Sequence, residues 1–274
     1  MSNHDLSFAR ALVREARAIA LSRAFRSHAT SAKGQAVNLV TETDVAVEKA
    51  LVAAIRSERP TDEILGAESG ISSTEITPTI GSAHRRWILD PIDGTTNFAH
   101  GLPFFVISVG LEIDGSPAVG VVDAPALGWT FWAAAGEGAF WSRTPEASDA
   151  TQLYVSSTEA LEAALLATGF PYDLHSNPRN NFRQFERLYR ASQGIRRVGA
   201  AALDFAMVAA GWFDGFWEMR LKPWDAAAGR LLVTEAGGRV TNLVGDRFDL
   251  AAGDVVASNG KIHDAMIRTL DDRG

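Results

Sequence analysis

The chain contains no cysteine among its 274 residues. This absence excludes disulfide bonds, thiolate nucleophiles, cysteine-ligated zinc and iron–sulfur clusters. Histidine is also sparse, because the six histidines are scattered along the sequence without the spacing of metal ligands. We assign none of them a catalytic role, so any chemistry of this chain rests on carboxylates, hydroxyls and backbone amides.

The sequence also lacks long apolar runs and an excess of basic residues. No stretch approaches the roughly 20 apolar residues of a membrane-spanning helix, and the N-terminus does not resemble a signal peptide. We therefore expect a cytoplasmic protein without a membrane partner. The formal net charge of −7 argues against a nucleic-acid partner. The basic residues between positions 179 and 197 are interpreted as a solvated face.

Residues 87–98 have the sequence Trp-Ile-Leu-Asp-Pro-Ile-Asp-Gly-Thr-Thr-Asn-Phe. The apolar run 86–89 predicts a strand, and the Pro-x-x-Gly that follows predicts its end. Asp90 and Asp93 would then lie at the C-terminal edge of a strand, where α/β folds bind ligands. Closely spaced carboxylates suit Mg²⁺, and the amides of the following Gly-Thr-Thr suit an anion. The alternative is a loop of solvated Asp residues that caps a helix.

Two further segments each supply one carboxylate. Residues 64–70 form a short apolar run that leads to Glu68, and residues 222–229 place Asp225 at the start of a predicted helix. An Asp at a helix N-terminus is usually a cap, so Asp225 alone would not indicate a site. If the fold brings these two carboxylates to Asp90 and Asp93, the four groups form a two-metal cage.

These three segments resemble, in order, the signature blocks of the inositol monophosphatase family, and bacterial inositol-1-monophosphatases most closely. Residues 38–44 resemble the N-terminal block of the family, and residues 169–173, 197–202 and 234–238 resemble segments of bacterial members. The resemblance covers nearly the whole chain. It implies a Mg²⁺-dependent, Li⁺-sensitive phosphomonoesterase that forms a homodimer. The implied fold is of the α+β or α/β class, a layered α-β-α-β-α sandwich as in the inositol monophosphatases and sugar phosphatases.

The resemblance also implies roles for individual residues. Roughly two or three Mg²⁺ ions per subunit would be bound by four carboxylates and one main-chain carbonyl, those of Glu68, Asp90, Ile92, Asp93 and Asp225. Hydrolysis would use a metal-activated water, with Glu68, Thr95 and Asp93 as the catalytic residues. Glu68 and the Thr95 hydroxyl would orient this water and accept its proton. The amides of Gly94 and Thr95 would bind the phosphate.

Substrate contacts are implied at a second set of positions. Glu218 aligns with a glutamate that contacts a hydroxyl of the sugar alcohol, and further contacts would come from Asp93, Gly199, Ala200, Ala201 and Asp225. Lys33 aligns with a mobile-loop lysine near a third, weak metal position, although an exposed loop lysine is the simpler interpretation.

The chain departs from the family pattern at two positions near this site. Asn38 and Ala67 stand where the family commonly has acidic residues, so we expect weaker binding of an additional Mg²⁺ with activity retained. Arg220 and Lys222 add positive charge beside Glu218. They would favour a substrate with a second anionic group or simply pair with Glu218.

The leading functional hypothesis is hydrolysis of inositol monophosphate to inositol and phosphate. L-histidinol phosphate and fructose 1,6-bisphosphate are alternatives on the same scaffold, because the signature blocks say little about the leaving alcohol. The expected partner is thus a small phosphorylated polyol or amino alcohol. A hypothesis of another class is a protein-binding role with the transcription machinery, as in some bacterial relatives.

Hydrophobic periodicity divides the chain into two parts. The polar stretch 142–151 predicts a boundary between an N-terminal α+β domain, residues 1–145, and a C-terminal α/β domain, residues 146–274. The first part predicts helices over 6–26 and 44–59, then antiparallel strands over 104–113, 117–124, 128–134 and 138–141. The second predicts helices over 157–167, 178–193, 200–211, 224–237 and 261–270, with strands over 213–218 and 255–258.

Overall fold

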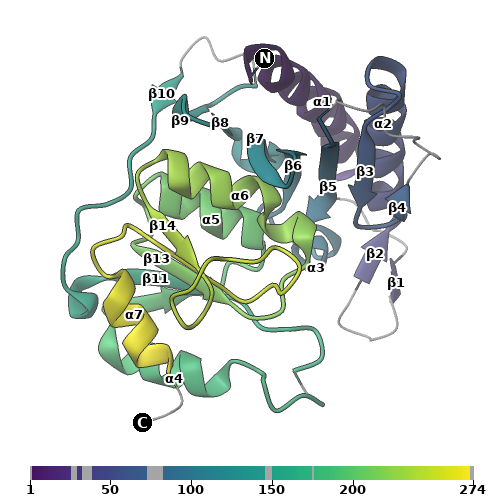
Figure 1. Cartoon of the computed structure of the whole chain (residues 1–274). Coiled ribbons are helices and arrows are strands. Elements are labelled where there is room, and N and C mark those ends of the chain that lie inside the picture. The colour runs from purple at the N-terminus through teal and green to yellow at the C-terminus, as the bar shows by residue number, and fades with distance from the viewer. Residues whose placement is uncertain are drawn as a thin grey trace.

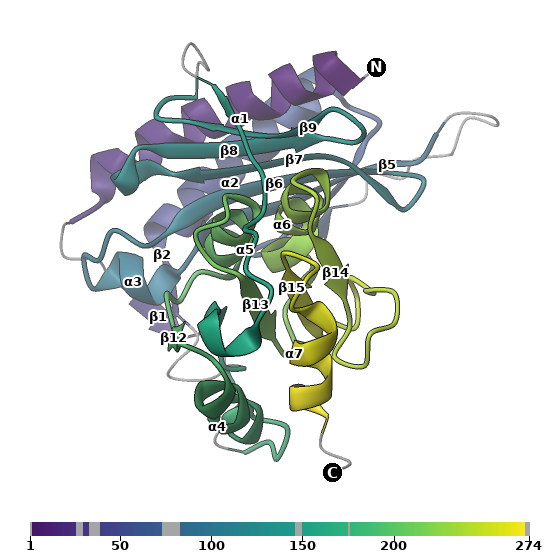
Figure 2. The same ribbon diagram turned by 90° about the vertical axis from the view of Figure 1, so that its left-hand side faces the viewer.

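The computed structural model describes residues 2–25, 30–32, 39–72, 83–145, 150–174 and 176–271. In these ranges helices and sheets alternate in five layers, as Figures 1 and 2 show from two directions. The predicted layered α-β-α-β-α sandwich is therefore confirmed. None of the helices in this part of the chain has the length and apolar character needed to cross a membrane.

The first two layers are a helix pair and a large sheet. The helices are α1 (Ser2–Arg23) and α2 (Glu42–Glu58). The sheet has eight strands, in the order β10 (Thr151–Gln152), β9 (Gly138–Ser142), β8 (Trp129–Ala134), β7 (Ser116–Ala124), β6 (Val106–Ile113), β5 (Arg85–Asp93), β3 (Glu63–Gly66) and β4 (Gly70–Ser72). Only the β3–β5 pair is parallel. The predicted antiparallel meander over β6 to β9 is confirmed, because each of these strands pairs in antiparallel with the next.

Three small elements border this sheet. They are the hairpin of β1 (Thr30–Ala32) and β2 (Leu39–Thr41), the short helix α3 (Thr95–Ala99) that follows β5, and the 3₁₀ turn η1 (Pro125–Leu127) between β7 and β8.

The central layer consists of α5 (Ala201–Ala209) and α6 (Pro223–Glu235). Helix α6 lies on β6 and β7 at two glycines, Gly110 and Gly120, that are paired in register. A Cβ atom at Gly120 would lie 2.7 Å from the carbonyl oxygen of Ala228, and one at Gly110 would lie 2.8 Å from the Cβ of Ala227. The two glycines therefore allow α6 to approach the sheet more closely than any side chain would permit.

The last two layers are a smaller sheet and an outer helix pair. The sheet has five strands, in the order β12 (Gly194–Arg196), β11 (Leu165–Thr168), β13 (Gly215–Glu218), β15 (Val255–Ser258) and β14 (Arg239–Thr241). The outer helices are α4 (Phe182–Ala191) and α7 (His263–Leu270).

The helix predicted over 157–167 is wrong. This segment forms the 3₁₀ turn η2 (Leu161–Ala163) and the strand β11, which pairs in parallel with β12 and β13. Its run Leu-Leu-Ala-Thr is almost completely buried, and a short buried strand has the same continuous apolar pattern as a buried helix turn.

The predicted division at residues 145 and 146 stays a prediction, and residues 146–149 lie outside the described ranges. One apolar core nevertheless contains residues of both halves, including Phe131 of the large sheet with Phe205 and Phe216 of the second half.

Candidate active site

Three carboxylates, two of them buried and that of Asp225 half-buried, meet where β5 ends. Oxygen atoms of Asp90, Asp93 and Asp225 lie within 4.8 Å of one another. Asp90 and Asp93 belong to β5, and Asp225 comes from the first turn of α6. The structure thus brings together three of the four carboxylates singled out in the sequence.

A bulge in β5 explains how two carboxylates three residues apart reach the same place. In a regular strand, residues i and i+3 point to opposite faces. Here Asp90 pairs with Ser108 and Asp93 pairs with Val106, so β5 has one more residue than β6 between these two pairs. The extra residue turns Asp93 back to the face of Asp90. The strand was predicted to stop before Pro91, which is wrong, because β5 continues through the bulge to Asp93.

Asp93 is held from the other half of the molecule. Its Oδ2 atom accepts a hydrogen bond of 2.7 Å from the Ala202 amide in the first turn of α5. The next residue, Gly94, has φ of +89°, and a Cβ atom there would lie 2.8 Å from the carbonyl oxygen of Phe104. A glycine is therefore required to turn the chain directly from Asp93 into α3.

Asp225 caps the start of α6. Its Oδ2 atom accepts a hydrogen bond of 2.6 Å from the Lys222 amide, so the capping role foreseen from the sequence is present. A carboxylate has two oxygens and several lone pairs, so a cap does not prevent Asp225 from binding a cation as well.

Glu68 lies in the turn between β3 and β4, and Glu48 of α2 holds this turn. The Glu48 carboxylate accepts hydrogen bonds of 2.8 Å from the amides of Glu68 and Ser69. The absence of a Cβ atom at Gly66 leaves room for the Glu48 carboxylate. Glu68 is outside the 4.8 Å group but lines the same cavity of about 110 Å³, together with Asp90, Ile92, Asp93, Gly94, Thr95 and Asp225.

The Thr95 hydroxyl is placed by a residue that we did not single out in the sequence. Its Oγ1 atom lies 2.9 Å from the Ile92 carbonyl oxygen and 3.1 Å from Oδ1 of Asp44. Asp44 is buried and also completes a capping box with Thr41 at the start of α2. The Thr-x-x-Asp signal of this capping box was readable, but its contact with Thr95 depends on the packing of α2 against β5.

The carboxylate cluster is electrostatically unfavourable without a cation. Burial, with the charges of Asp93 and Asp225, raises the pKa of Asp90 well above its usual value. Burial and the charge of Asp225 raise the pKa of Asp93 to about 7, although amide donors such as that of Ala202 oppose the shift. A divalent cation would relieve this repulsion, and a set of hard oxygen donors fits Mg²⁺.

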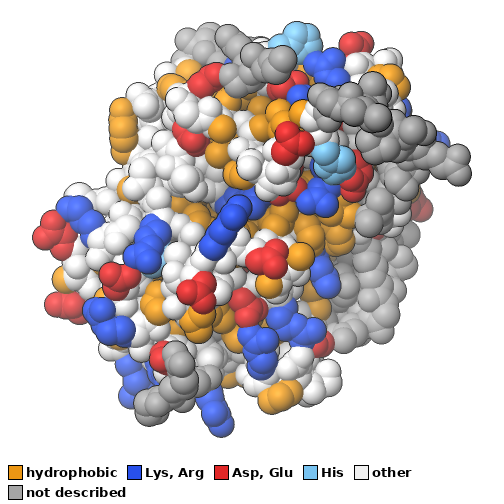
Figure 3. Space-filling model, viewed as in Figure 1, with side chains coloured by type: hydrophobic (Ala, Val, Ile, Leu, Met, Phe, Trp, Pro, Cys, Tyr) orange, Lys and Arg blue, Asp and Glu red, His pale blue; other side chains and the backbone are white. Residues whose placement is uncertain are grey.

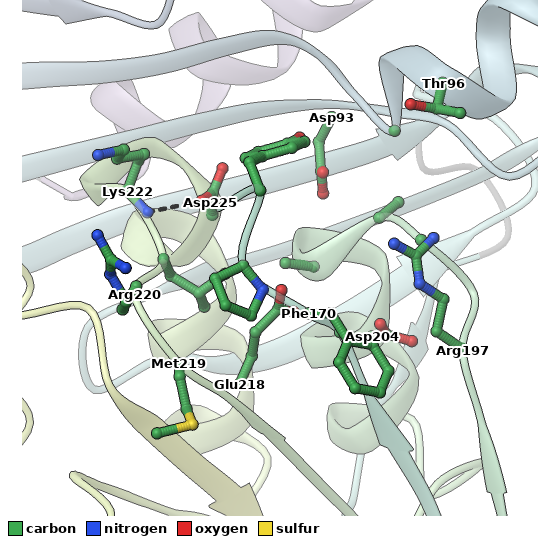
Figure 4. A pocket seen from close by; sticks show the side chains of 18 of the residues that line it. Asp93, Thr96, Phe170, Arg197, Asp204, Glu218, Met219, Arg220, Lys222 and Asp225 are labelled. Atoms are coloured by element: carbon green, nitrogen blue, oxygen red, sulfur yellow. Dashed lines mark hydrogen bonds between the residues drawn. The ribbon is translucent and has the colours of Figure 1, made fainter. Parts of the chain in front are cut away.

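A second cavity of about 80 Å³ continues from the carboxylates toward the second sheet. Figure 4 shows Asp93 and Asp225 at one end of it, Arg197 and Asp204 at the other, and Glu218 between them. The remaining residues that the sequence predicts for substrate or phosphate also line it, namely Gly94, Thr95, Thr96, Gly199, Ala200 and Ala201.

Glu218 is able to enter this cavity because residue 169 is a glycine. A Cβ atom at Gly169 would lie 2.2 Å from both carboxylate oxygens of Glu218. Burial, together with the charges of Asp225 and Asp93, raises the pKa of Glu218 to about 8, while Arg197 opposes the shift. Hydrogen-bond donors on a bound molecule would therefore stabilise the Glu218 carboxylate.

Asp204 and Tyr172 are further lining residues that the sequence did not reveal. Asp204 is buried, and its Oδ1 atom has no hydrogen-bond partner in the described part of the chain. Tyr172 lines both cavities, although 53% of its surface is exposed. Both depend on contacts between distant segments, so no local pattern marks them.

The positive residues near Glu218 do not pair with it. Arg220 forms an ion pair with Asp173, and Lys222 donates its amide to Asp225. The predicted pairing with Glu218 is therefore wrong, because Asp173 lies within reach of the Arg220 side chain. Lys33 and Asn38 lie outside the described residues, whereas Ala67 lines the cavity that contains Glu68.

Comparison with known proteins identifies this arrangement. The model of the inositol monophosphatase family matches residues 2–274. This chain belongs to the inositol monophosphatase family. It is accordingly a phosphatase of a Mg²⁺-dependent family, in agreement with the hard-oxygen donor set at the end of β5.

Individual members of the family are similar over most of the chain. An inositol-1-monophosphatase of Synechocystis sp. is 41% identical over 238 residues, which are 87% of this chain and 78% of the relative. A protein named Nus factor SuhB, of Pseudomonas aeruginosa, is 42% identical over 237 residues, 86% of this chain and 83% of that protein. The structure of an inositol monophosphatase from Anabaena (Nostoc) sp. superposes with a TM-score of 0.83 at 37% identity and covers 98% of this chain and 95% of that one.

Proposed function

We propose that this phosphatase hydrolyses inositol monophosphate to inositol and phosphate. The observation that carries the proposal is the continuity of the two cavities, which place three clustered carboxylates at one end and the Glu218 carboxylate further along. Such a site would bind a phosphate at the carboxylates through cations and accept hydrogen bonds from ring hydroxyls at Glu218. The names of the Synechocystis and Anabaena relatives support this choice of substrate.

The ligands of the cations are proposed residue by residue. Asp90, Asp93 and Asp225 would hold Mg²⁺ with Glu68 and the carbonyl oxygen of Ile92, in a site for roughly two or three ions. When bound, Mg²⁺ would neutralise charge on the phosphate and lower the pKa of a water molecule. All five groups supply oxygen donors, as Mg²⁺ requires.

The remaining steps belong to side chains and amides of this chain. Glu68 and Thr95 would orient the attacking water. Thr95 Oγ1 would accept a hydrogen bond from this water while its own hydroxyl hydrogen points to Asp44 Oδ1, 3.1 Å away. The proton of the water would pass to the Glu68 carboxylate. The amides of Gly94 and Thr95 would bind phosphate oxygens, and Asp93 would stay fixed by the Ala202 amide during the reaction.

Recognition of the alcohol would fall to the far end of the cavity. Glu218 would accept hydrogen bonds from hydroxyl groups, and the segment with Gly199, Ala200 and Ala201 would form the wall beside the ring. A site built to bind hydroxyls rejects molecules that lack them, because its buried polar groups are then left unpaired. The ammonium group of histidinol phosphate would also bind Glu218. Histidinol phosphate is therefore the alternative substrate that this site would distinguish least well.

Phosphate release with Mg²⁺ would test the proposal on four compounds: inositol 1-phosphate, histidinol phosphate, fructose 1,6-bisphosphate and adenosine 3′,5′-bisphosphate. We expect the highest kcat/KM for inositol 1-phosphate, and a higher value for any other compound would refute the assigned substrate. Asp225→Asn should abolish turnover of all four, whereas Asp246→Asn, at an exposed position outside both cavities, should retain it. We also expect inhibition by Li⁺.

The quaternary structure and location are proposed with the function. We propose a cytoplasmic homodimer whose contact includes the exposed side chains of Leu102 and Phe104, beside a hollow of about 350 Å³ lined also by Arg196 and Arg197. Light scattering at micromolar concentration should give twice the mass of the chain, and Phe104→Glu should give a monomer. A dimer unchanged by this variant would show that the contact lies elsewhere.

A protein-binding role with the transcription machinery is the second candidate, because one similar protein is named a Nus factor. On the face that Figure 3 shows, acidic and basic side chains are interspersed rather than gathered in one basic surface. Retention of RNA polymerase by the immobilised protein, unchanged in Asp225→Asn, would support the second role.

A further inference from the structure

A separate cavity of about 380 Å³ lies outside the candidate active site. Three arginines from distant parts of the sequence line it: Arg86 on β5, Arg230 on α6, and Arg247 in the segment between β14 and β15. The other lining residues are Glu112, Gly115, Phe248, Asp249, Leu250 and Ala251. None of these residues lines either cavity of the active site.

Strand and helix periodicities explain why the arginines meet. Residues 86 and 90 lie on the same face of β5, and Arg86 pairs across the strands with Glu112 of β6. On that face of β6, Ser108 contacts Trp224 and Gly110 lies under Ala227. Two residues further along the strand and about one turn further along α6, Glu112 therefore meets Arg230.

Glu112 cannot satisfy all three guanidinium groups. Its Oε2 atom accepts hydrogen bonds from Arg86, at 2.5 Å from Nη2 and 3.2 Å from Nε, and its Oε1 atom accepts one from Arg230. Arg247 is exposed, and no described residue forms an ion pair with it. Oδ1 of Asp249 is occupied by the Ala251 amide, 2.9 Å away.

The Nε atom of Arg230 lacks a hydrogen-bond acceptor among the described residues. Only 14% of the Arg230 side chain is exposed, and this Nε atom is buried. Burial and the neighbouring charges of Arg86 and Arg247 lower its pKa, although Glu112 opposes the shift. An added anion would offset the repulsion among these three guanidinium groups, so its binding in the cavity would be favourable.

We propose that this cavity binds the phosphate group of a small anion, either inorganic phosphate or a phosphate monoester. The lining has three guanidinium groups against two carboxylates, which leaves one positive charge in excess. The guanidinium groups come from a strand, a helix and a loop. This arrangement suits the several oxygens of a tetrahedral phosphate, and guanidinium groups bind phosphate through paired hydrogen bonds.

The arginine-lined cavity is distinct from the active site, but both are built on β5 and α6. Arg86 precedes Asp90 by four residues of β5, about 13 Å along the strand. Arg230 follows Asp225 by five residues of α6, about 7.5 Å along the helix. A bound phosphate would therefore bridge the two elements that carry the clustered carboxylates, away from the carboxylates themselves.

Calorimetric titration of metal-free protein with inorganic phosphate, at low ionic strength, would test the proposal. Without Mg²⁺ the clustered carboxylates repel phosphate, so binding there does not interfere. We expect one phosphate per chain. Arg247→Gln should weaken this binding about tenfold or more, because it removes a charged donor without disturbing a contact in the core. Arg230→Lys should also weaken it, because the positive charge remains but the paired donors are lost.

Arg239→Gln is the matched control, because Arg239 is exposed and pairs with Asp264 outside the cavity. It should bind phosphate like the unchanged protein. Glycerol 2-phosphate in the same titration distinguishes the two sources: binding of both anions indicates a site for phosphate monoesters, and binding of inorganic phosphate alone indicates a site for the free ion. Absence of binding for both anions would overturn the proposal. It would also be overturned if the Arg247→Gln and Arg230→Lys variants bound phosphate as tightly as the unchanged protein.

Discussion

Gly110→Ala tests whether the close approach of α6 to the sheet positions Asp225. The new Cβ atom would lie 2.8 Å from the Cβ of Ala227 and 3.3 Å from the amide nitrogen of Ala228. Carbon atoms in contact stay roughly 3.5–4 Å apart, so α6 must retreat from β6 by about 0.7–1.2 Å. Asp225 lies on the first turn of this helix and would move with it.

Two magnitudes follow from this displacement. Inserting a methyl group into a close-packed contact destabilises a protein by about 1–3 kcal/mol. A displacement of catalytic groups by about 1 Å reduces activity by up to ~100-fold. We therefore expect Gly110→Ala to lower the free energy of unfolding in this range and to lower kcat/KM by about 10- to 100-fold. The Mg²⁺ concentration for half-maximal activity should rise.

The assay combines urea unfolding with phosphate release measured over a range of Mg²⁺ concentrations. Gly194→Ala is the control, because a Cβ atom there meets Arg196 at 3.5 Å and Leu165 at 3.8 Å, both ordinary contacts. Adding Ala227→Gly to Gly110→Ala removes the closest clash and should restore part of the activity. Unchanged stability and activity in Gly110→Ala, or no recovery in the double variant, would refute the reasoning.

Three further predictions concern other contacts. Gly169→Ala should displace Glu218 and lower kcat/KM for inositol 1-phosphate about 10-fold or more, with the Mg²⁺ dependence of phosphate release unchanged. Asp44→Ala should lower kcat about 100-fold in the same assay, and urea unfolding should show a loss of about 1 kcal/mol for the α2 cap; full activity would exclude a role beyond the cap. Burial lowers the pKa of His263 to about 4, below its unfolded value near 6.5. The unfolded state then binds the extra proton, so the free energy of unfolding should fall by about 2–3 kcal/mol as pH drops from 6.5 to 4. Urea titrations should show a smaller fall in His263→Gln.

The layered fold and the carboxylate cluster could be predicted because distinctive local segments carry the family resemblance that implies them. Asp90, Asp93 and Asp225 lie in segments with distinctive sequences, and the structure brings their oxygens within 4.8 Å. The roles proposed for them stay predictions. The bulge that makes their meeting possible was not predicted, because Pro91 was interpreted only as the end of a strand.

Other parts of the site depend on contacts between distant segments. Asp44 reaches Thr95 across 51 positions of the sequence, and Ala202 reaches Asp93 across 109. No periodicity or motif indicates such pairs, because they arise only when the layers pack. The failure at β11 has another cause, since a short run that is buried on both faces carries no period with which to separate strand from helix.

The hydrogen bonds between Glu48 and the turn after β3 have a consequence for redesign of the metal preference. Glu48 binds the main-chain amides of Glu68 and Ser69, and these amides are present whatever side chains the two positions carry. The loop anchor and the donor atom that we propose for the cation are thus encoded separately. Replacing Glu68 by a residue with a nitrogen donor would change the chemical hardness of the site while the scaffold beneath it keeps its shape, which makes position 68 the natural entry point for engineering a different cation dependence.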